Sequence, residues 1–362
     1  MKVIFFGTPD FAVSSLEKLL NTPEIEVVGV VTQPDRKRGR GSQVSPSPVK
    51  SLALQHQLPL WQPERIKKDP EVLAQLQNAG ADFFAVVAYG QILSTEILAK
   101  PKLGCINVHG SLLPEYRGAA PIQWCLYRGA EVTGITTMLM DEGMDTGAML
   151  LQESLDINLE ITATELAIAL AEIGANLLIK TLHQFPTITP IPQEAALATY
   201  APLIKKTDYE LDWTRDSLAL HNQIRGFVPN CTTTLGGQSL KILSSLPLGS
   251  NYWAKLPPAV RVLDQINFPA GHNPGEIVYL AKNLGIVVQT GAGLLLLTKV
   301  QPVAKGIQSA WDFANGNRLQ VGSAFFIRAN MSQDGDYLEL KKQIFGDQTA
   351  REIYQKIKES QD

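Results

Sequence analysis

The segment INVHGSLLPEYRGAAP, residues 106–121, changes character halfway along its length. Its first residues alternate between aliphatic and polar side chains, so in a strand Asn107 and His109 project from the same face. Its second half cannot continue the strand, because Pro114 and Gly118 are typical of loops. We therefore predict a strand that ends in a stiff loop, with an amide and an imidazole together at its end.

The segments around this strand alternate between apolar runs and helical patterns. Helices are predicted at about residues 10–20, 46–55 and 162–183, and Thr162 with Glu165 forms a capping box that starts the last of them. This alternation predicts an α/β fold with a Rossmann-like, mostly parallel sheet and helices on both faces. The predicted strands of this first domain, residues 1–184, are 2–6, 26–31, 81–89, 104–109 and 133–140.

The second half of the chain follows a different pattern. Residues 185–205 are irregular and rich in proline, which is typical of a linker. A helix is expected over about 211–227, and the short apolar runs after it, separated by glycine and proline, predict a small barrel or sandwich within residues 206–328. Residues 329–362 are expected to form a helical tail, for which the sequence indicates no role.

The composition is that of a globular protein, with 45% apolar and 19% charged residues in a chain of 362. No segment approaches the ~18 uninterrupted apolar residues of a membrane span, and the apolar start KVIFF is too short for a signal peptide. The cysteines, Cys105, Cys125 and Cys231, form no CxxC pair, so we expect neither a disulfide framework nor a zinc site. We expect a cytoplasmic protein with no metal and no membrane contact, and a monomer by default.

Charge is unevenly distributed along the chain, although the formal net charge is only −3. Residues 1–200 hold 15 Lys and Arg against 21 Asp and Glu, whereas residues 201–330 hold 12 against 7. A basic second domain on an acidic chain is typical of binding to a polyanion, although an asymmetry of this size also arises by chance.

The polar pair at the strand end is a candidate catalytic site. Open α/β sheets bind ligands at the carboxyl ends of their parallel strands, and an amide donor beside an imidazole suits the stabilisation of an oxyanion. The segment MDEGMDTGAM, residues 140–149, follows the next strand and is expected at the same edge, where Asp145 would reach His109 and either hold it charged or accept a proton. The alternatives are a histidine that bonds only to a backbone carbonyl and an acidic hairpin loop without function.

Other catalytic patterns are missing from the sequence. It contains neither a Ser-His-Asp triad nor a Cys–His pair, which favours direct transfer at a carbonyl over a covalent enzyme intermediate. The first turn, GTPD at residues 7–10, is not GxGxxG, which argues against a nicotinamide-dependent oxidoreductase. No GxxxxGK[ST] motif is present, which argues against an ATPase.

A basic insertion interrupts the first domain at about residues 33–45. Insertions of this length inside a compact α/β domain are usually functional, and this one suits binding to a phosphate backbone, although solvated basic loops are also common. Its positive charges are Arg36, Lys37, Arg38 and Arg40.

Five segments, in this order and spacing, resemble the methionyl-tRNA formyltransferases, a branch of the folate-dependent formyltransferase superfamily. They are FFGTPDFAVSSLEKLL, GVVTQPDRKRGRG, VVAYGQIL, GCINVHGSLLPEYRGAAPIQW and MDEGMDTGAMLL, and the resemblance extends over about residues 1–325. It implies that residues 1–184 form the catalytic domain and that residues 206–328 form an OB-like barrel that binds tRNA. The reaction implied is transfer of the formyl group of 10-formyltetrahydrofolate to the methionine of initiator methionyl-tRNA.

The resemblance also implies roles for individual residues. Asn107, His109 and Asp145 would be catalytic. The basic insertion would contact the acceptor stem of the tRNA through Arg36, Lys37, Arg38 and Arg40. The folate site would be formed by Ser111, Leu112, Leu113 and Pro114 together with Val87, Tyr89, Gly90 and Ile92.

Some positions depart from the family pattern. Ser42 and Gln43 stand where a lysine pair is frequent, Glu115 stands where a basic residue is frequent, and residues 226–231 read GFVPNC where the family tends to an aromatic and proline-rich segment. Two alternatives stay open. One is a related folate-dependent formyltransferase or formyl-folate hydrolase that acts on a small substrate, and the other is an RNA-binding module with a vestigial site.

Overall fold

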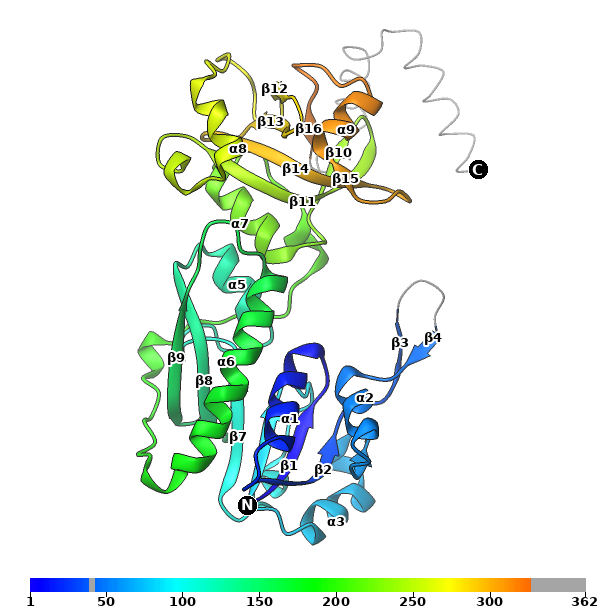
Figure 1. The fold of residues 1–362 in the computed structure, drawn as a ribbon, viewed down its shortest axis with the longest axis vertical. Helices are drawn as coiled ribbons and strands as arrows, with labels where there is room; N and C mark the ends of the chain where they lie inside the picture. Colours follow the sequence, from blue (N-terminus) through cyan, green and yellow to red (C-terminus); the bar gives the residue numbers. More distant parts are fainter. Residues whose placement is uncertain (39–42, 327–362) are drawn as a thin grey trace. The chain divides into compact units, whose positions relative to one another are not determined.

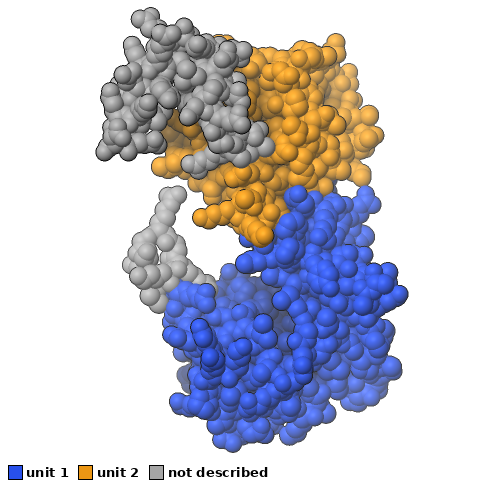
Figure 2. All heavy atoms as spheres, turned by 180° about the vertical axis from the view of Figure 1, so that it is seen from behind, with its two compact units in different colours: residues 1–204 blue, residues 205–362 orange. Residues whose placement is uncertain are grey.

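The computed structural model describes residues 1–38 and 43–326. Two compact units are distinguished by their internal contacts: residues 1–204 form the first, and the second begins at Lys205 (Figure 2). Arg40, Ser42 and the predicted tail, residues 329–362, lie outside the described residues. The limits of the predicted linker and domains stay a prediction.

The first unit is built around a seven-stranded sheet with the order β5-β2-β1-β6-β7-β8-β9. Strands β1, β2, β7, β8 and β9 of this sheet are labelled in Figure 1. The first five strands of this order are parallel, and β8 and β9 are antiparallel to their neighbours. The predicted mostly parallel α/β sheet is therefore confirmed. The strands are β1 (Lys2–Gly7), β2 (Glu26–Val31), β5 (Leu60–Trp61), β6 (Phe83–Val87), β7 (Gly104–His109), β8 (Val132–Leu139) and β9 (Met149–Asp156).

Both faces of this sheet are covered by helices, which explains why its inner strands are apolar throughout. In β1, Val3 and Phe5 face one hydrophobic core while Ile4 and Phe6 face the other. The first core also contains α1 (Val13–Leu20), α2 (Pro48–Gln55), α5 (Pro121–Tyr127) and α6 (Ala163–Gln184). The second core contains α3 (Pro70–Asn78) and α4 (Thr95–Leu98).

Helix α6 begins with the predicted capping box, in which Thr162 accepts from the Glu165 backbone and Glu165 accepts from the Thr162 backbone. In length and composition it is the one helix among residues 1–38 and 43–326 that fits a membrane span. Its buried side chains, however, belong to the core beneath β7 and β8, so it is a core helix of this unit.

The second unit contains an antiparallel sheet with the order β12-β13-β14-β11-β10-β16, and β15 pairs with β14. An isolated bridge joins Glu276, next to β12, to Ala324, next to β16, so the two ends of this order approach each other and the sheet curls. The expected small barrel is thus confirmed as a curled antiparallel sheet. Its strands are β10 (Thr232–Leu235), β11 (Gln238–Leu248), β12 (Ile277–Ala281), β13 (Gly285–Gln289), β14 (Leu294–Pro302), β15 (Gln308–Ser309) and β16 (Phe325–Phe326).

Shorter elements complete the two units. The helices of the second unit are α7 (Ser217–Phe227), α8 (Pro258–Arg261) and α9 (Ala310–Gly316). The 3₁₀ turns are η1 (Asp10–Ala12), η2 (Ile66–Lys68), η3 (Phe185–Thr187), η4 (Ala195–Leu197), η5 (Lys206–Tyr209), η6 (Trp253–Lys255) and η7 (Val262–Gln265).

The basic insertion is more regular than the sequence predicts. Strands β3 (Arg36–Arg38) and β4 (Gln43–Ser45) pair with each other in antiparallel register, apart from the main sheet. The two described arms of the insertion therefore form a hairpin. Three consecutive basic residues show no apolar alternation that would indicate a strand, whereas backbone pairing between the two arms does not depend on side-chain type.

Candidate active site

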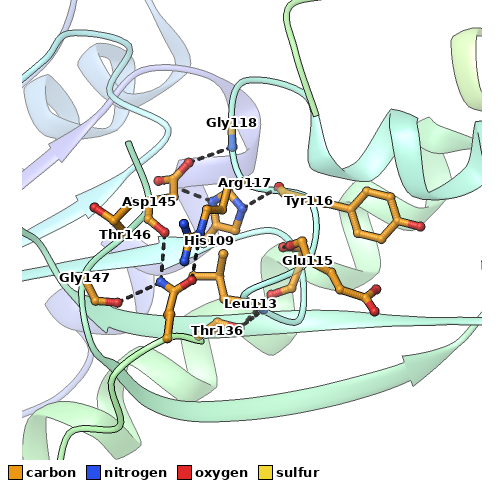
Figure 3. Close-up of polar contacts among 12 residues, drawn as sticks. His109, Leu113, Glu115, Tyr116, Arg117, Gly118, Thr136, Asp145, Thr146 and Gly147 are labelled. Carbon is orange, nitrogen blue, oxygen red and sulfur yellow. Dashed lines mark hydrogen bonds and ion pairs between the residues drawn. The ribbon is translucent and has the colours of Figure 1, made fainter. Parts of the chain in front are cut away.

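His109 ends strand β7 and is buried, with 6% of its side chain exposed. Its Nε2 lies 3.0 Å from the carbonyl oxygen of Tyr116 (Figure 3). Because a carbonyl oxygen only accepts hydrogen bonds, Nε2 is the donor and carries a hydrogen. Nδ1 is therefore the ring nitrogen that is left to gain or lose a proton, and it faces Asp145.

Asp145 lies beside His109, as expected, but it does not reach this position in the expected way. Strand β8 is antiparallel to β7, with Leu139 beside Ile106 and Thr136 beside His109. The carboxyl end of β8 therefore lies beside the start of β7 and not beside its end. The expectation that the two strands end on the same side of the sheet was wrong. The loop must turn back along the sheet to bring Asp145 to the imidazole.

The Asp145 carboxylate is held between two partners. Its Oδ2 accepts a hydrogen bond from the Gly118 backbone N–H at 2.9 Å, and its Oδ1 lies 3.7 Å from His109 Nδ1. That second distance is too long for a direct hydrogen bond, but it places the carboxylate next to the imidazole ring. The carboxylate is thus held facing Nδ1 of the imidazole.

Asn107 lies two residues before His109 on the same face of β7 and is partly exposed. Its side chain forms no hydrogen bond with any residue in the described part of the chain. A partly buried amide without a protein partner is free to donate to a ligand. The Asn107 amide is thus available to a ligand at this end of β7.

The loop after His109 is fixed to strand β8 through one threonine. Thr136 Oγ1 donates to the Ser111 carbonyl at 2.7 Å and accepts from the Leu113 N–H at 3.0 Å. Ser111 Oγ donates to the Glu115 carbonyl at 2.6 Å, and Glu115 itself is exposed. The backbone of this loop is thus tied to the sheet at Ser111 and Leu113.

The structure distributes the predicted folate residues between the core and the surface. Tyr89 packs edge-on against Phe6, and its hydroxyl is buried without a hydrogen-bond partner, so burial raises the pKa of Tyr89. Ile92 is 74% exposed, and Gly90 adopts a positive φ of 84°. Val87, Ser111 and Leu113 are buried, whereas Leu112 and Pro114 are partly exposed. Contact of these residues with folate stays a prediction.

Thiol chemistry is absent from this site. All three cysteines are buried, and burial raises the pKa of Cys105 and of Cys231 to about 12. Both are protonated at neutral pH and are poor nucleophiles. Within residues 1–38 and 43–326, no group of three or more His, Cys, Asp and Glu side chains is arranged to hold a metal ion.

Two site residues escaped prediction from the sequence. Arg117 is only 5% exposed, and its Nε donates to Gln193 Oε1 at 2.9 Å. Gln193 Nε2 in turn donates to the carbonyls of Asp145 and Gly147, both at 2.8 Å. The position of Arg117 in the loop after His109, directly before a glycine, could have indicated a site residue. The sequence around Gln193, in the predicted linker, contains no such indication.

Three of the predicted tRNA-binding residues lie in strand β3. Arg36 in β3 is exposed, and its Nη2 donates to Gln33 at 3.3 Å. Lys37 and Arg38 belong to the same strand, and Arg40 lies outside the described residues. Their role stays a prediction.

Comparison with known proteins identifies the family. The formyl transferase family model matches residues 1–182, and the model for the formyl transferase C-terminal domain matches residues 203–318. A methionyl-tRNA formyltransferase of Cyanothece sp. is 60% identical over 328 residues, which covers 89% of this chain and 98% of that relative. The chain belongs to the methionyl-tRNA formyltransferase family. A family member from Synechocystis sp. is 54% identical and is covered completely, with 90% of this chain aligned.

Solved structures agree with this family at the level of the fold. The sugar 3N-formyltransferase WlaRD, crystallised with dTDP and 5-N-formyl-THF, superposes with a TM-score of 0.58 at 19% identity and covers 84% of this chain. An N-formyltransferase of Helicobacter canadensis, crystallised with folinic acid and dTDP-3-aminofucose, gives 0.59 at 19% identity and covers 83%. In each case 99% of the neighbour is covered, so the fold is shared over nearly the whole length of that protein.

Proposed function

We propose that this formyltransferase transfers the formyl group of 10-formyltetrahydrofolate to the α-amino group of methionine on initiator tRNA, with Asn107, His109 and Asp145 as catalytic residues. The reaction is that of the family to which the chain belongs. The observation that carries the residue assignment is the unpartnered Asn107 amide beside the His109–Asp145 pair. We further propose that the enzyme acts as a monomer in the cytoplasm.

The amine of the acceptor attacks the formyl carbon, and the formyl oxygen becomes an oxyanion. Asn107 donates a hydrogen bond to this oxyanion as the charge develops, which lowers the barrier because the donor is already in place. His109 is held by the Tyr116 carbonyl through Nε2, so its Nδ1 accepts the proton that the attacking amine loses. Asp145 stabilises the imidazolium that results.

Collapse of the tetrahedral intermediate breaks the bond between the formyl carbon and N10 of the folate. The electron pair of that bond goes to N10, and the proton stored on His109 follows it, so the products are formylmethionyl-tRNA and tetrahydrofolate. No residue forms a covalent bond with the formyl group, in agreement with the buried, protonated thiols. The chain thus provides a donor, a proton carrier and a counter-ion.

Two features of the described residues fit a folate co-substrate next to this trio. The Asn107 amide has no partner, and the Tyr89 hydroxyl is buried without one, which is unusual unless a ligand supplies it. Asn107 lies in β7, and Tyr89 lies in the turn after β6. These two parallel strands are neighbours in the sheet. Ligands of open α/β sheets bind at such strand ends.

Binding of the tRNA is supported by charge. Residues 201–330 carry 12 basic against 7 acidic residues, and the β3–β4 hairpin adds Arg36, Lys37 and Arg38. Cations of this kind bind phosphate groups without reading the base sequence. We assign the hairpin and the second unit to the tRNA backbone.

A formylation assay tests this function directly. The purified enzyme is incubated with 10-formyltetrahydrofolate and with methionyl-tRNA of either the initiator or the elongator kind. We expect rapid formylation of the initiator and little of the elongator. Formyl transfer to a small amine or to water, without transfer to the initiator tRNA, would instead identify a small-substrate formyltransferase or a hydrolase.

A further inference from the structure

The segment between the two family-model matches takes part in the first unit's active site. The matches end at residue 182 and resume at residue 203, and Gln193 lies between them. We propose that Gln193 is a positioning residue that fixes Asp145 against His109, an inference that rests on the proposed function. Its evidence is a set of contacts within residues 1–204.

Gln193 uses both ends of its amide. Nε2 has two hydrogens, and they go to the carbonyls of Asp145 and Gly147, while Oε1 accepts from Arg117 Nε. These three bonds define which end of the amide is which, because the reverse orientation would place Oε1 against two carbonyl oxygens. The Gln193 side chain therefore has one orientation that satisfies all of its neighbours.

These bonds connect the two loops that contact His109. One loop supplies the Tyr116 carbonyl to Nε2 and contains Arg117, and the other supplies Asp145 to Nδ1. Gln193 holds the first loop through Arg117 and the second through its backbone. The relative position of the two loops, and hence the 3.7 Å between Asp145 and the imidazole, depends on this side chain.

The backbone of Asp145 is in a conformation that benefits from such support. Its φ is +55°, a left-handed value that costs a non-glycine residue free energy, although aspartate tolerates it better than most. The Gln193 bond to the Asp145 carbonyl stabilises this turn, and the bond from the Gly118 N–H aims the carboxylate. Without Gln193 the turn is free to relax toward a more common conformation.

The segment that carries Gln193 is anchored on both sides of it. Ile191 exchanges two backbone hydrogen bonds with Met149, next to the Asp145 loop. Farther along, the Thr199 carbonyl accepts from the Arg117 N–H, and the Ala201 N–H donates to the Arg117 carbonyl. Gln193 is thus placed by backbone pairing rather than by its own side chain.

Three single variants separate the roles of this amide. Gln193→Ala removes all three bonds, Gln193→Glu keeps an acceptor for Arg117 but loses both donors, and Glu194→Ala alters an exposed neighbour and serves as the control. We expect Gln193→Ala and Gln193→Glu to lower kcat by about 10- to 100-fold, the cost of a displacement of about 1 Å at a reacting group, with little change in either KM. Recovery of wild-type kcat in Gln193→Glu would overturn the proposal, because only the Arg117 contact would then matter.

A double-mutant cycle with Asp145→Asn tests whether Gln193 acts through Asp145. We expect Gln193→Ala to lower kcat by less than about threefold in the Asp145→Asn background, since the group it positions is no longer functional. Equal losses in both backgrounds would mean a general structural role and would overturn the proposal. Thermal melts of each variant, together with single-turnover rates, keep loss of folding apart from loss of positioning.

The same measurements distinguish this inference from the proposed function. If the wild-type enzyme does not formylate initiator methionyl-tRNA, the proposed function fails. If Asp145→Asn strongly lowers kcat while Gln193→Ala leaves kcat unchanged, the proposed function stands and the role of Gln193 is refuted.

Discussion

At the scale of single residues, the site depends on a backbone carbonyl as much as on the side chains that β7 presents. Alternation along a strand is enough to place Asn107 and His109 on one face. The carbonyl that accepts from His109 belongs to Tyr116, whose φ of +58° brings it back toward the ring. Such a turn is set by contacts with neighbouring segments and has no signature in the local sequence. Gln193 was missed for the same reason, because its partners are distant in the sequence.

Replacement of Asn107 by alanine removes the donor for the oxyanion. We expect kcat to fall by about 10²–10³, because the donor acts mainly in the transition state, and KM for both substrates to change little. Steady-state formylation of initiator methionyl-tRNA measures both parameters. Asn78→Ala, at an exposed position in α3, is the control, and turnover of Asn107→Ala close to that of the control would contradict the assignment.

The cysteines give a second prediction at this scale. Because burial raises the pKa of Cys105 and Cys231 to about 12, the native enzyme carries almost no thiolate on them at pH 8. We expect iodoacetamide to leave both residues unmodified, and activity intact, until the protein is unfolded. Mass spectrometry after timed alkylation makes the measurement, and fast labelling of Cys105 in active enzyme would show that β7 opens.

At the scale of secondary structure elements, the presence of a strand was easier to predict than the direction in which it runs. Each predicted apolar strand of the first domain is present, because a run of buried side chains has the same pattern whichever way the strand runs. For the same reason the pattern did not reveal that β8 is antiparallel to β7, and the route of the Asp145 loop was mispredicted. Length and composition of the β7–β8 connection do not decide the direction either, because α5 lies within it.

Gly118 joins two of these elements and cannot be replaced by alanine without cost. Its φ is +120°, and an added Cβ would lie 2.7 Å from the Ala201 carbonyl oxygen. We expect Gly118→Ala to destabilise the fold by about 1–3 kcal/mol and to lower kcat, because its N–H would no longer aim Asp145. Thermal unfolding and formylation rates are the measurements. Gly306→Ala, where a Cβ meets no neighbour within 4 Å, is the control, and equal stability of the two variants would contradict the prediction.

At the scale of the whole molecule, two features of the sequence were informative for different reasons. The order and spacing of five motifs identified the family, because no single motif is specific but their combination is. The charge distribution pointed to a polyanionic partner without showing which residues bind it. Net charge acts over many residues, so it predicts a class of partner and the salt dependence of binding rather than a site.

We therefore expect the KM for the tRNA, and not the KM for the folate, to depend strongly on salt. Each phosphate contact releases condensed cations, so we expect KM for initiator methionyl-tRNA to rise steeply between 50 and 200 mM salt, by roughly 10-fold or more if several contacts form. KM for the folate should change little over the same range. Arg36→Ala should lower the slope of log KM against log salt by about one, as expected for one lost phosphate contact, whereas Lys18→Ala in α1 should leave it unchanged. If Arg36→Ala leaves the slope at its wild-type value, Arg36 in the β3–β4 hairpin makes no phosphate contact. The electrostatic part of tRNA binding would then be assigned to the basic second unit.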